Sequence, residues 1–236
     1  MVFSNNLLAG AGGQSTGYDI EQSIRFNDDD SAFLSRTPGS TSNRKTYTVS
    51  LWFKIGKVGG EPAFFVAGDY PGGASGSFTG MLLQNAVAAS PLLTFSEYPG
   101  GASYTWQVQT NAIFRDPSAW YHFVGAVDTT QSTASDRVKL YVNGELQTDL
   151  RVSSYPSLNH DTLINDSSHT NRIGRYGTTS FYADGYMAEF NFIDGTALDP
   201  TSFGKTNSNT GQWVPIEYTG SYGTNGFYLK GEDSSD

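Results

Sequence analysis

Hydrophobic and polar residues alternate along several short stretches of this chain, which is the pattern of strands with one buried face. In residues 46–55 the apolar side chains share one face and the other face is polar except for Trp52. We therefore expect the outer side of that sheet to be covered, either by this chain or by a partner. The shared apolar face consists of Tyr47, Val49, Leu51, Phe53 and Ile55.

Further strand-like stretches follow, separated by clusters of Gly, Ser, Asn, Asp and Thr. Short strands in this number, with no long amphipathic helix, predict an all-β fold. The expected architecture is a two-sheet antiparallel sandwich. The predicted strands are residues 23–26, 32–34, 62–68, 79–84, 92–97, 104–110, 120–128, 137–143, 171–174 and 185–193.

A β-meander is predicted in the middle of the chain. Residues 120–128 and 137–143 are both strongly strand-forming, and a polar segment joins them. The Asn143-Gly144 pair then supplies the positive φ angles of a type I′ hairpin turn into a third strand.

Three segments are expected along the 236 residues. Residues 1–18 are rich in Gly, Ser and Asn and predict an N-terminal arm, and residues 19–200 hold the sandwich. Residues 201–236 change to a composition rich in Asn, Thr, Gly and Tyr, and we expect an extension that wraps the core or docks on a neighbouring molecule. With 37% hydrophobic residues, the chain can build one substantial core.

The net charge of −9 argues against nucleic acid as a partner, because phosphate groups repel an acidic surface. The chain has no cysteine, so it can form neither a disulfide nor a thiolate metal site. No stretch approaches the length of about 20 apolar residues that a membrane helix needs, and the N-terminus lacks the pattern of a signal peptide. We therefore expect no membrane insertion, and release from a cell by lysis or within a larger particle.

An internal repeat marks the main candidate site. The heptapeptide DYPGGAS at residues 69–75 returns as EYPGGAS at residues 97–103. Each copy follows a predicted strand and two strands lie between them, so both copies should leave the sandwich at the same end. They would then present Asp69, Tyr70, Glu97 and Tyr98 together, for a glycan or a protein partner, unless both copies are plain turns.

The order of the strand motifs resembles the laminin-G-like, concanavalin-A-like lectin superfamily over about residues 20–200. The resemblance implies a jelly-roll sandwich. Members often carry an acidic pair in the last strand, whereas here Ala188 takes the place of the first acid and only Glu189 remains. The motifs that carry the resemblance are QSIRFN at 22–27, YTVSLWF at 47–53, WYHFV at 120–124, KLYVNGE at 139–145, RIG at 172–174, GYMAEFNFI at 185–193 and TAL at 196–198.

The flanking segments more narrowly resemble virion structural proteins of marine tailed phages. They include AFLSRT at 32–37, FIDGTALDP at 192–200 and GFYL at 226–229. This resemblance implies a capsid-surface, tail or fibre component that is made in the host cytoplasm and works in the virion. Its expected partners are other virion proteins, further copies of the same chain in a homo-oligomer, and host-surface glycan. The alternatives are a free carbohydrate-binding module and a degenerate glycoside hydrolase.

We expect no enzymatic activity and assign no catalytic residue. The Glu-x-Asp-x-Glu signature of related glycoside hydrolases is absent, and Glu189 has no second carboxylate along its strand. His122 lies within a strand, where a hydrogen-bonded structural role is expected, and the other two histidines lie in polar loops. No cofactor is expected except calcium, for which the Asn27-Asp-Asp-Asp30 turn offers Asp28 and Asp30 as candidate ligands.

Overall fold

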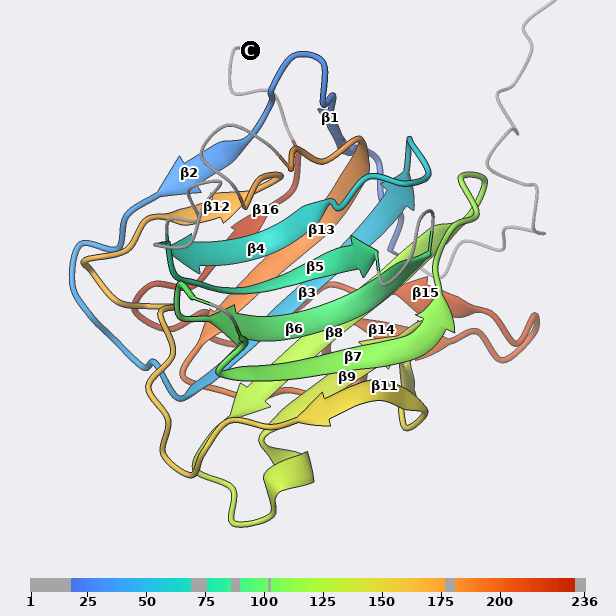
Figure 1. Ribbon diagram of the computed structural model, residues 1–236. Coiled ribbons are helices and arrows are strands. Elements are labelled where there is room, and N and C mark those ends of the chain that lie inside the picture. Colours follow the sequence, from blue (N-terminus) through green and yellow to red (C-terminus); the bar gives the residue numbers. More distant parts are fainter. Residues whose placement is uncertain (1–17, 69–75, 86–89, 102, 177–180, 232–236) are drawn as a thin grey trace, which may run out of the picture.

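The computed structural model describes residues 18–68, 76–85, 90–101, 103–176 and 181–231. Two seven-stranded sheets pack face to face, and every strand pair in them is antiparallel (Figure 1). The predicted all-β sandwich is therefore confirmed.

Sheet A has the strand order β1-β13-β3-β8-β9-β10, and β16 pairs with β13 beside β1. The longest strands lie in its centre. Its members are β1 (Ile24–Phe26), β3 (Thr46–Ile55), β8 (Trp120–Asp128), β9 (Val138–Val142), β10 (Glu145–Leu146), β13 (Gly185–Asp194) and β16 (Phe227–Leu229).

Sheet B has the order β11-β7-β6-β5-β4-β12-β2. Its centre is the up-and-down series from β4 to β7. Its members are β2 (Leu34–Arg36), β4 (Ala63–Gly68), β5 (Phe78–Asn85), β6 (Pro91–Tyr98), β7 (Trp106–Ile113), β11 (Leu150–Ser154) and β12 (Asn171–Ile173).

The core between the sheets is aromatic. The β3 residues predicted to share one face are all buried, and they meet Phe65, Phe95 and Trp106 from sheet B. Tyr47 illustrates the packing, because its ring lies 6.1 Å from Phe95 and 6.3 Å from Phe192, measured between centroids. Close aromatic pairs of this kind add to the hydrophobic stabilisation of the two layers.

The Asn143-Gly144 turn forms as predicted. The φ angles of these residues are 49° and 85°, and Glu145 pairs with Val142 across the hairpin. Each predicted strand overlaps an observed one, although β2 begins two residues later than expected. The prediction missed β11, which pairs with β7 through a register shift at its start.

The C-terminal segment covers part of the outer face of sheet A. A small hairpin of β14 (Gly204–Thr206) and β15 (Trp213–Pro215) follows a 3₁₀ turn at Pro200–Ser202, and a second such turn lies at Ala134–Asp136. Phe203 packs with Val124 and Ile193 on that outer face. The described part of this extension thus packs against its own sandwich, and its docking on a neighbouring molecule stays a prediction. No helix in the described ranges is long and apolar enough to cross a membrane.

Candidate functional site

A row of three glutamines lies on the outer face of sheet B, and we call Gln84, Gln107 and Gln109 the amide row. Leu83 in β5 points into the core, so its neighbour Gln84 points outward. In the same way, Gln107 and Gln109 flank the core residue Val108 in β7. The pleat of two strands of one sheet thus brings three amides to one surface.

Hydrogen bonds hold the Gln84 amide in one orientation. Its Oε1 accepts from Nε2 of Gln107 at 2.8 Å and from Nε2 of Gln109 at 3.3 Å, and its own Nε2 donates to the Tyr104 hydroxyl at 2.6 Å. Nε2 of Gln109 also donates to Oγ1 of Thr94 at 2.9 Å. The carbonyl oxygens of Gln107 and Gln109 accept no hydrogen bond from the described residues. Gln107 is half-buried whereas Gln109 is only 4% exposed, so Gln107 is the one of the two that presents a positioned acceptor to a ligand that carries hydroxyl groups.

Tyrosine rings border the amide row. Tyr98 and Tyr104 are half-buried, and their rings meet edge to face with centroids 5.5 Å apart. Phe78 lies behind them, with its ring 6.1 Å from that of Tyr98. Ser96 pairs with Gln107 between the strands, and its buried hydroxyl has no hydrogen-bond partner among the described residues. Aromatic rings next to amides and hydroxyls are the usual components of a sugar-binding surface.

The strands β4 and β6, which lead into the two copies of the repeat, end at the same side of sheet B, as the topology predicted. β4 and β6 both run antiparallel to β5, and Gly68 and Tyr98 flank Phe78 at the same level. Asp69 and Tyr70 lie outside the described residues. The grouping of the four predicted side chains therefore stays a prediction, and Tyr98 is the member that the structure places on the outer face.

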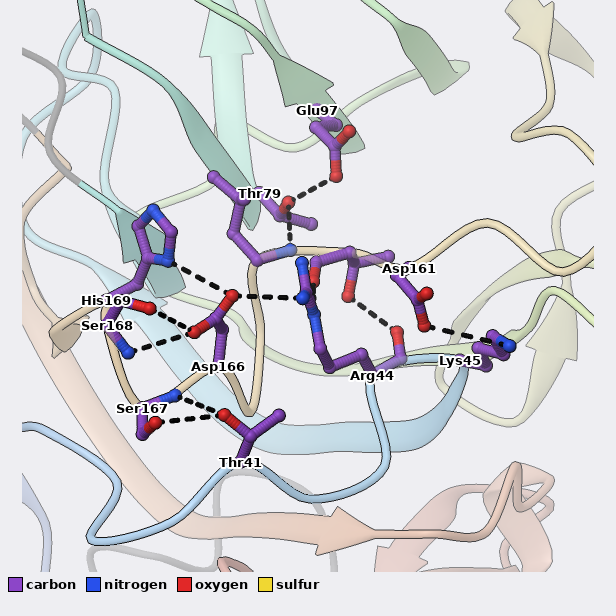
Figure 2. Close-up of polar contacts among 12 residues, drawn as sticks. Thr41, Arg44, Lys45, Thr79, Glu97, Asp161, Asp166, Ser167, Ser168 and His169 are labelled. Atoms are coloured by element: carbon purple, nitrogen blue, oxygen red, sulfur yellow. Dashed lines mark hydrogen bonds and ion pairs between the residues drawn. The ribbon is translucent and has the colours of Figure 1, made fainter.

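The Glu97 carboxylate forms hydrogen bonds within the fold. Its side chain is buried, Oε2 accepts from Oγ1 of Thr79 at 2.7 Å, and Oε1 lies 2.7 Å from Nε2 of His160 (Figure 2 shows the Thr79 contact). Oγ1 of Thr79 in turn accepts from the backbone N–H of Leu163 at 3.1 Å. Glu97 thus fastens the loop of residues 155–170 to sheet B, and its hydrogen bond raises the pKa of His160.

A second polar cluster anchors the same loop next to Glu97 (Figure 2). The guanidinium of Arg44 donates to the carbonyl of Thr162 at 2.6 Å and lies 3.0 Å from the Asp166 carboxylate. Nδ1 of His169 lies 3.6 Å from that carboxylate, and Ser168 donates to it through both its hydroxyl and its backbone N–H. These bonds from Ser168 lower the pKa of Asp166 and so favour its charged carboxylate beside Arg44.

The candidate calcium ligands have partners within the chain. Oδ2 of Asp28 lies 2.6 Å from Nζ of Lys57, and this hydrogen bond lowers the pKa of Asp28. Oδ2 of Asp30 accepts from Nδ2 of Asn27 at 2.6 Å. Within the described ranges no group of three or more His, Cys, Asp or Glu side chains is arranged to hold a metal ion. An ammonium group therefore already balances the charge of Asp28, and calcium binding here stays a prediction.

Glu189 is a hydrogen-bonded strand residue. It sits at a bulge in β13 with φ of 50°, and its two carboxylate oxygens accept from the hydroxyls of Tyr18 at 2.5 Å and Tyr228 at 2.8 Å. Burial together with the Glu189 carboxylate raises the pKa of Tyr18 to about 12. The carboxylate thus ties the start of the described chain to β16.

His122 also has a structural position. Its ring stacks on Trp52 at 4.9 Å, Nε2 lies 2.9 Å from the hydroxyl of Ser50, and Nδ1 accepts from the indole N–H of Trp213 at 2.9 Å. Burial lowers the pKa of His122 to about 3, so the ring is neutral. This stack explains why Trp52 interrupts the polar face of β3: the C-terminal extension covers it.

Comparison with known proteins agrees with this architecture. A family model described as the concanavalin A-like lectin/glucanases superfamily matches residues 26–202. The chain belongs to this superfamily. No curated protein sequence matches this concanavalin A-like domain.

Two solved structures share the fold of this domain. A putative carbohydrate-binding protein from Bacteroides ovatus has a TM-score of 0.56 at 13% identity, covering 93% of this chain and 54% of that protein. Domain 4 of an extracellular arabinanase from Geobacillus stearothermophilus, solved in complex with arabinotriose, has a TM-score of 0.50 at 18% identity, covering 72% of this chain and 69% of that domain. The tailspike protein 2 of bacteriophage CBA120 reaches 0.48 at 12% identity over 77% of this chain and 26% of its own, which is too weak a likeness to test the phage resemblance.

The amide row was not predicted from the sequence. The signal for it was present in Gln107-Val-Gln109, where two amides flank one apolar residue in a predicted strand. Gln84, which joins the two amides, comes from another strand, so the hydrogen-bonded group exists only once β5 and β7 lie on either side of β6.

Proposed function

We propose that this domain binds an uncharged oligosaccharide at the amide row and does not cleave it. The observation that carries the proposal is the Gln84 amide, which is held by three hydrogen bonds beside the Tyr98 and Tyr104 rings. Amide carbonyls accept from sugar hydroxyls, and tyrosine rings pack against the apolar faces of sugars. A ligand of this kind needs no charged partner, and the net charge of −9 disfavours anionic glycans.

The comparisons support the same class of ligand. The domain belongs to a superfamily of lectins and glucanases, and the related arabinanase domain was solved with a neutral trisaccharide.

The proposal of binding without cleavage rests on the two buried carboxylates. Glu97 and Glu189 each have two partners within the fold, whereas retaining hydrolysis needs two available carboxylates about 5 Å apart.

Isothermal titration with a panel of oligosaccharides tests the proposal. The panel contains neutral arabino-, xylo- and gluco-oligosaccharides and two anionic ones, sialyllactose and oligogalacturonate. We expect saturable binding of at least one neutral sugar, and at least tenfold weaker binding by the double variant Gln107→Ala with Gln109→Ala. Gln212→Ala, an exposed glutamine of the β14–β15 hairpin, is the matched control and should bind like the wild type. The proposal fails if no neutral sugar binds or if the double variant keeps full affinity, and release of shorter sugars would refute non-cleavage.

We further propose, from the flanking motifs, that the domain works as a phage virion component that attaches to glycan on the host surface. Other virion proteins and further copies of this chain are its proposed partners. Immunolabelling of purified particles by electron microscopy tests this role: labelled particles are expected, and label found only in the particle-free lysate would favour the free carbohydrate-binding module. The sugar titration is independent of this result.

A further inference from the structure

An apolar crevice opens at one edge of the sandwich, far along sheet B from the amide row. It lies between β16 of sheet A and the edge strands β12 and β2 of sheet B, which come together in Figure 1. Its volume is about 340 Å³, and its principal lining residues are Leu34, Phe65, Asn171, Ile173, Phe227 and Leu229.

Leu34 shows that the core is incomplete at this edge. It pairs with Ile173, which is only 4% exposed within the core, and paired residues of neighbouring strands point to the same face. Leu34 therefore occupies a core-facing position, yet 39% of its surface is exposed. An inward-facing leucine exposed to this degree indicates room for an apolar group between the sheets.

Asn171 contributes a polar side chain to the lining of this apolar crevice. It is 5% exposed, and its buried Oδ1 has no hydrogen-bond partner among the described residues. Buried amide oxygens are nearly always hydrogen-bonded in folded proteins, to the chain, to water or to a ligand. An occupant of the crevice that carries a hydrogen-bond donor would satisfy this oxygen.

We propose that the crevice is a binding site for a small apolar molecule that carries one hydroxyl group. The apolar body would pack against Phe65, Phe227 and Leu229, and the hydroxyl would donate to Oδ1 of Asn171. A cavity of about 150 Å³ suffices for benzene, so this crevice has room for a ring with a substituent. Arg36 stands at the opening, with its guanidinium 5.6 Å from the Phe227 ring and one N–H donated to the carbonyl of Asn225 at 3.2 Å.

The matched probes benzyl alcohol and toluene separate the apolar and polar parts of the proposal. Binding is followed by backbone amide chemical shifts during titration of the full chain. The wild type should bind benzyl alcohol at least tenfold more tightly than toluene, with shift changes confined to β2, β4, β12 and β16. Asn171→Leu keeps the branched outline of the side chain and removes the amide, so it should abolish this preference while still binding toluene.

Filling the crevice gives an independent test. Leu34→Trp should remove binding of both probes, and Leu158→Trp, at an exposed leucine in the loop of residues 155–170, should leave binding unchanged. Circular dichroism and thermal unfolding establish that each variant folds. Failure of the wild type to bind either probe, unchanged binding by Leu34→Trp, or an unchanged preference in Asn171→Leu would overturn the proposal.

Discussion

The indole N–H of Trp213 donates to Nδ1 of His122 at 2.9 Å, and this hydrogen bond joins the C-terminal extension to the centre of sheet A. The Trp213 ring is accommodated next to two glycines. A Cβ atom at Gly144 or at Gly204 would lie 2.5 Å from the ring. The packing of the C-terminal extension on sheet A therefore depends on the Trp213 indole, on Nδ1 of His122 and on the glycines at positions 144 and 204. These residues come from distant parts of the sequence.

Replacing Trp213 with Phe should destabilise the domain by about 1–3 kcal/mol, because the buried Nδ1 of His122 loses its donor. Urea unfolding followed by circular dichroism measures the change. Trp120→Phe is the matched control, since Trp120 is half-buried and its indole makes no hydrogen bond to the described residues. Equal losses in the two variants would show that the hydrogen bond contributes nothing beyond ring size.

Gly204→Ala should destabilise the domain by about 1–3 kcal/mol, because the added methyl group displaces the Trp213 ring. Gly39→Ala is the control, since nothing lies within 4 Å of a Cβ atom built there and its φ angle is not in the left-handed region. Thermal unfolding of both variants checks the prediction. A melting temperature of Gly204→Ala equal to that of the wild type would contradict the packing described for Trp213.

Stability should fall as the pH drops below about 6.5, because His122 is buried in its neutral form. Its pKa is lowered from 6.5 to about 3 in the fold, so its contribution is complete above pH 6.5 and is lost as the pH falls toward 3. At pH 5 the loss from this residue should be about 2 kcal/mol. Urea unfolding between pH 7 and 5 measures the loss, and the ring proton signals of His122 should not titrate in that range.

His160 should act in the opposite direction. The hydrogen bond that His160 donates to Glu97 raises the pKa of His160, so its contribution is complete below pH 6.5 and is lost as the pH rises through the folded value. His160→Gln should therefore make the fall in stability between pH 7 and 5 steeper than in the wild type. A shallower fall in this variant would show that His160 does not gain its proton from the contact with Glu97.

The fold was predictable because the alternation in β3 and the run of strand-forming residues in β8 are local information. Both strands appear with the predicted bounds, and the Asn143-Gly144 turn sets the register of the next hairpin. β11 was missed because its alternating stretch, Leu150-Arg-Val-Ser-Ser154, is short and holds only two apolar residues, both of them half-buried. That strand forms because β7 offers an unpaired edge, which is a property of the assembled sheet.

The site was less predictable, because proximity in sequence does not determine whether a carboxylate is available. Glu97 and Tyr98 are neighbours in the repeat, and they are the last two residues of β6. Successive residues of a strand point to opposite faces, so Tyr98 reaches the outer face while Glu97 turns inward to His160. His160 belongs to a loop that no local pattern links to β6.

Tyr104→Phe tests whether an oriented Gln84 amide matters for sugar binding. The substitution keeps the ring beside Tyr98 and removes the hydroxyl that accepts from Nε2 of Gln84 at 2.6 Å. Gln84 then loses one of the contacts that hold its amide, and affinity for the neutral oligosaccharide should fall about three- to tenfold, the equivalent of one hydrogen bond. Tyr186→Phe, at an exposed tyrosine of sheet A, is the control. Titration calorimetry gives both affinities, and if Tyr104→Phe binds as tightly as the control, the rings carry the affinity and the orientation of the amide does not.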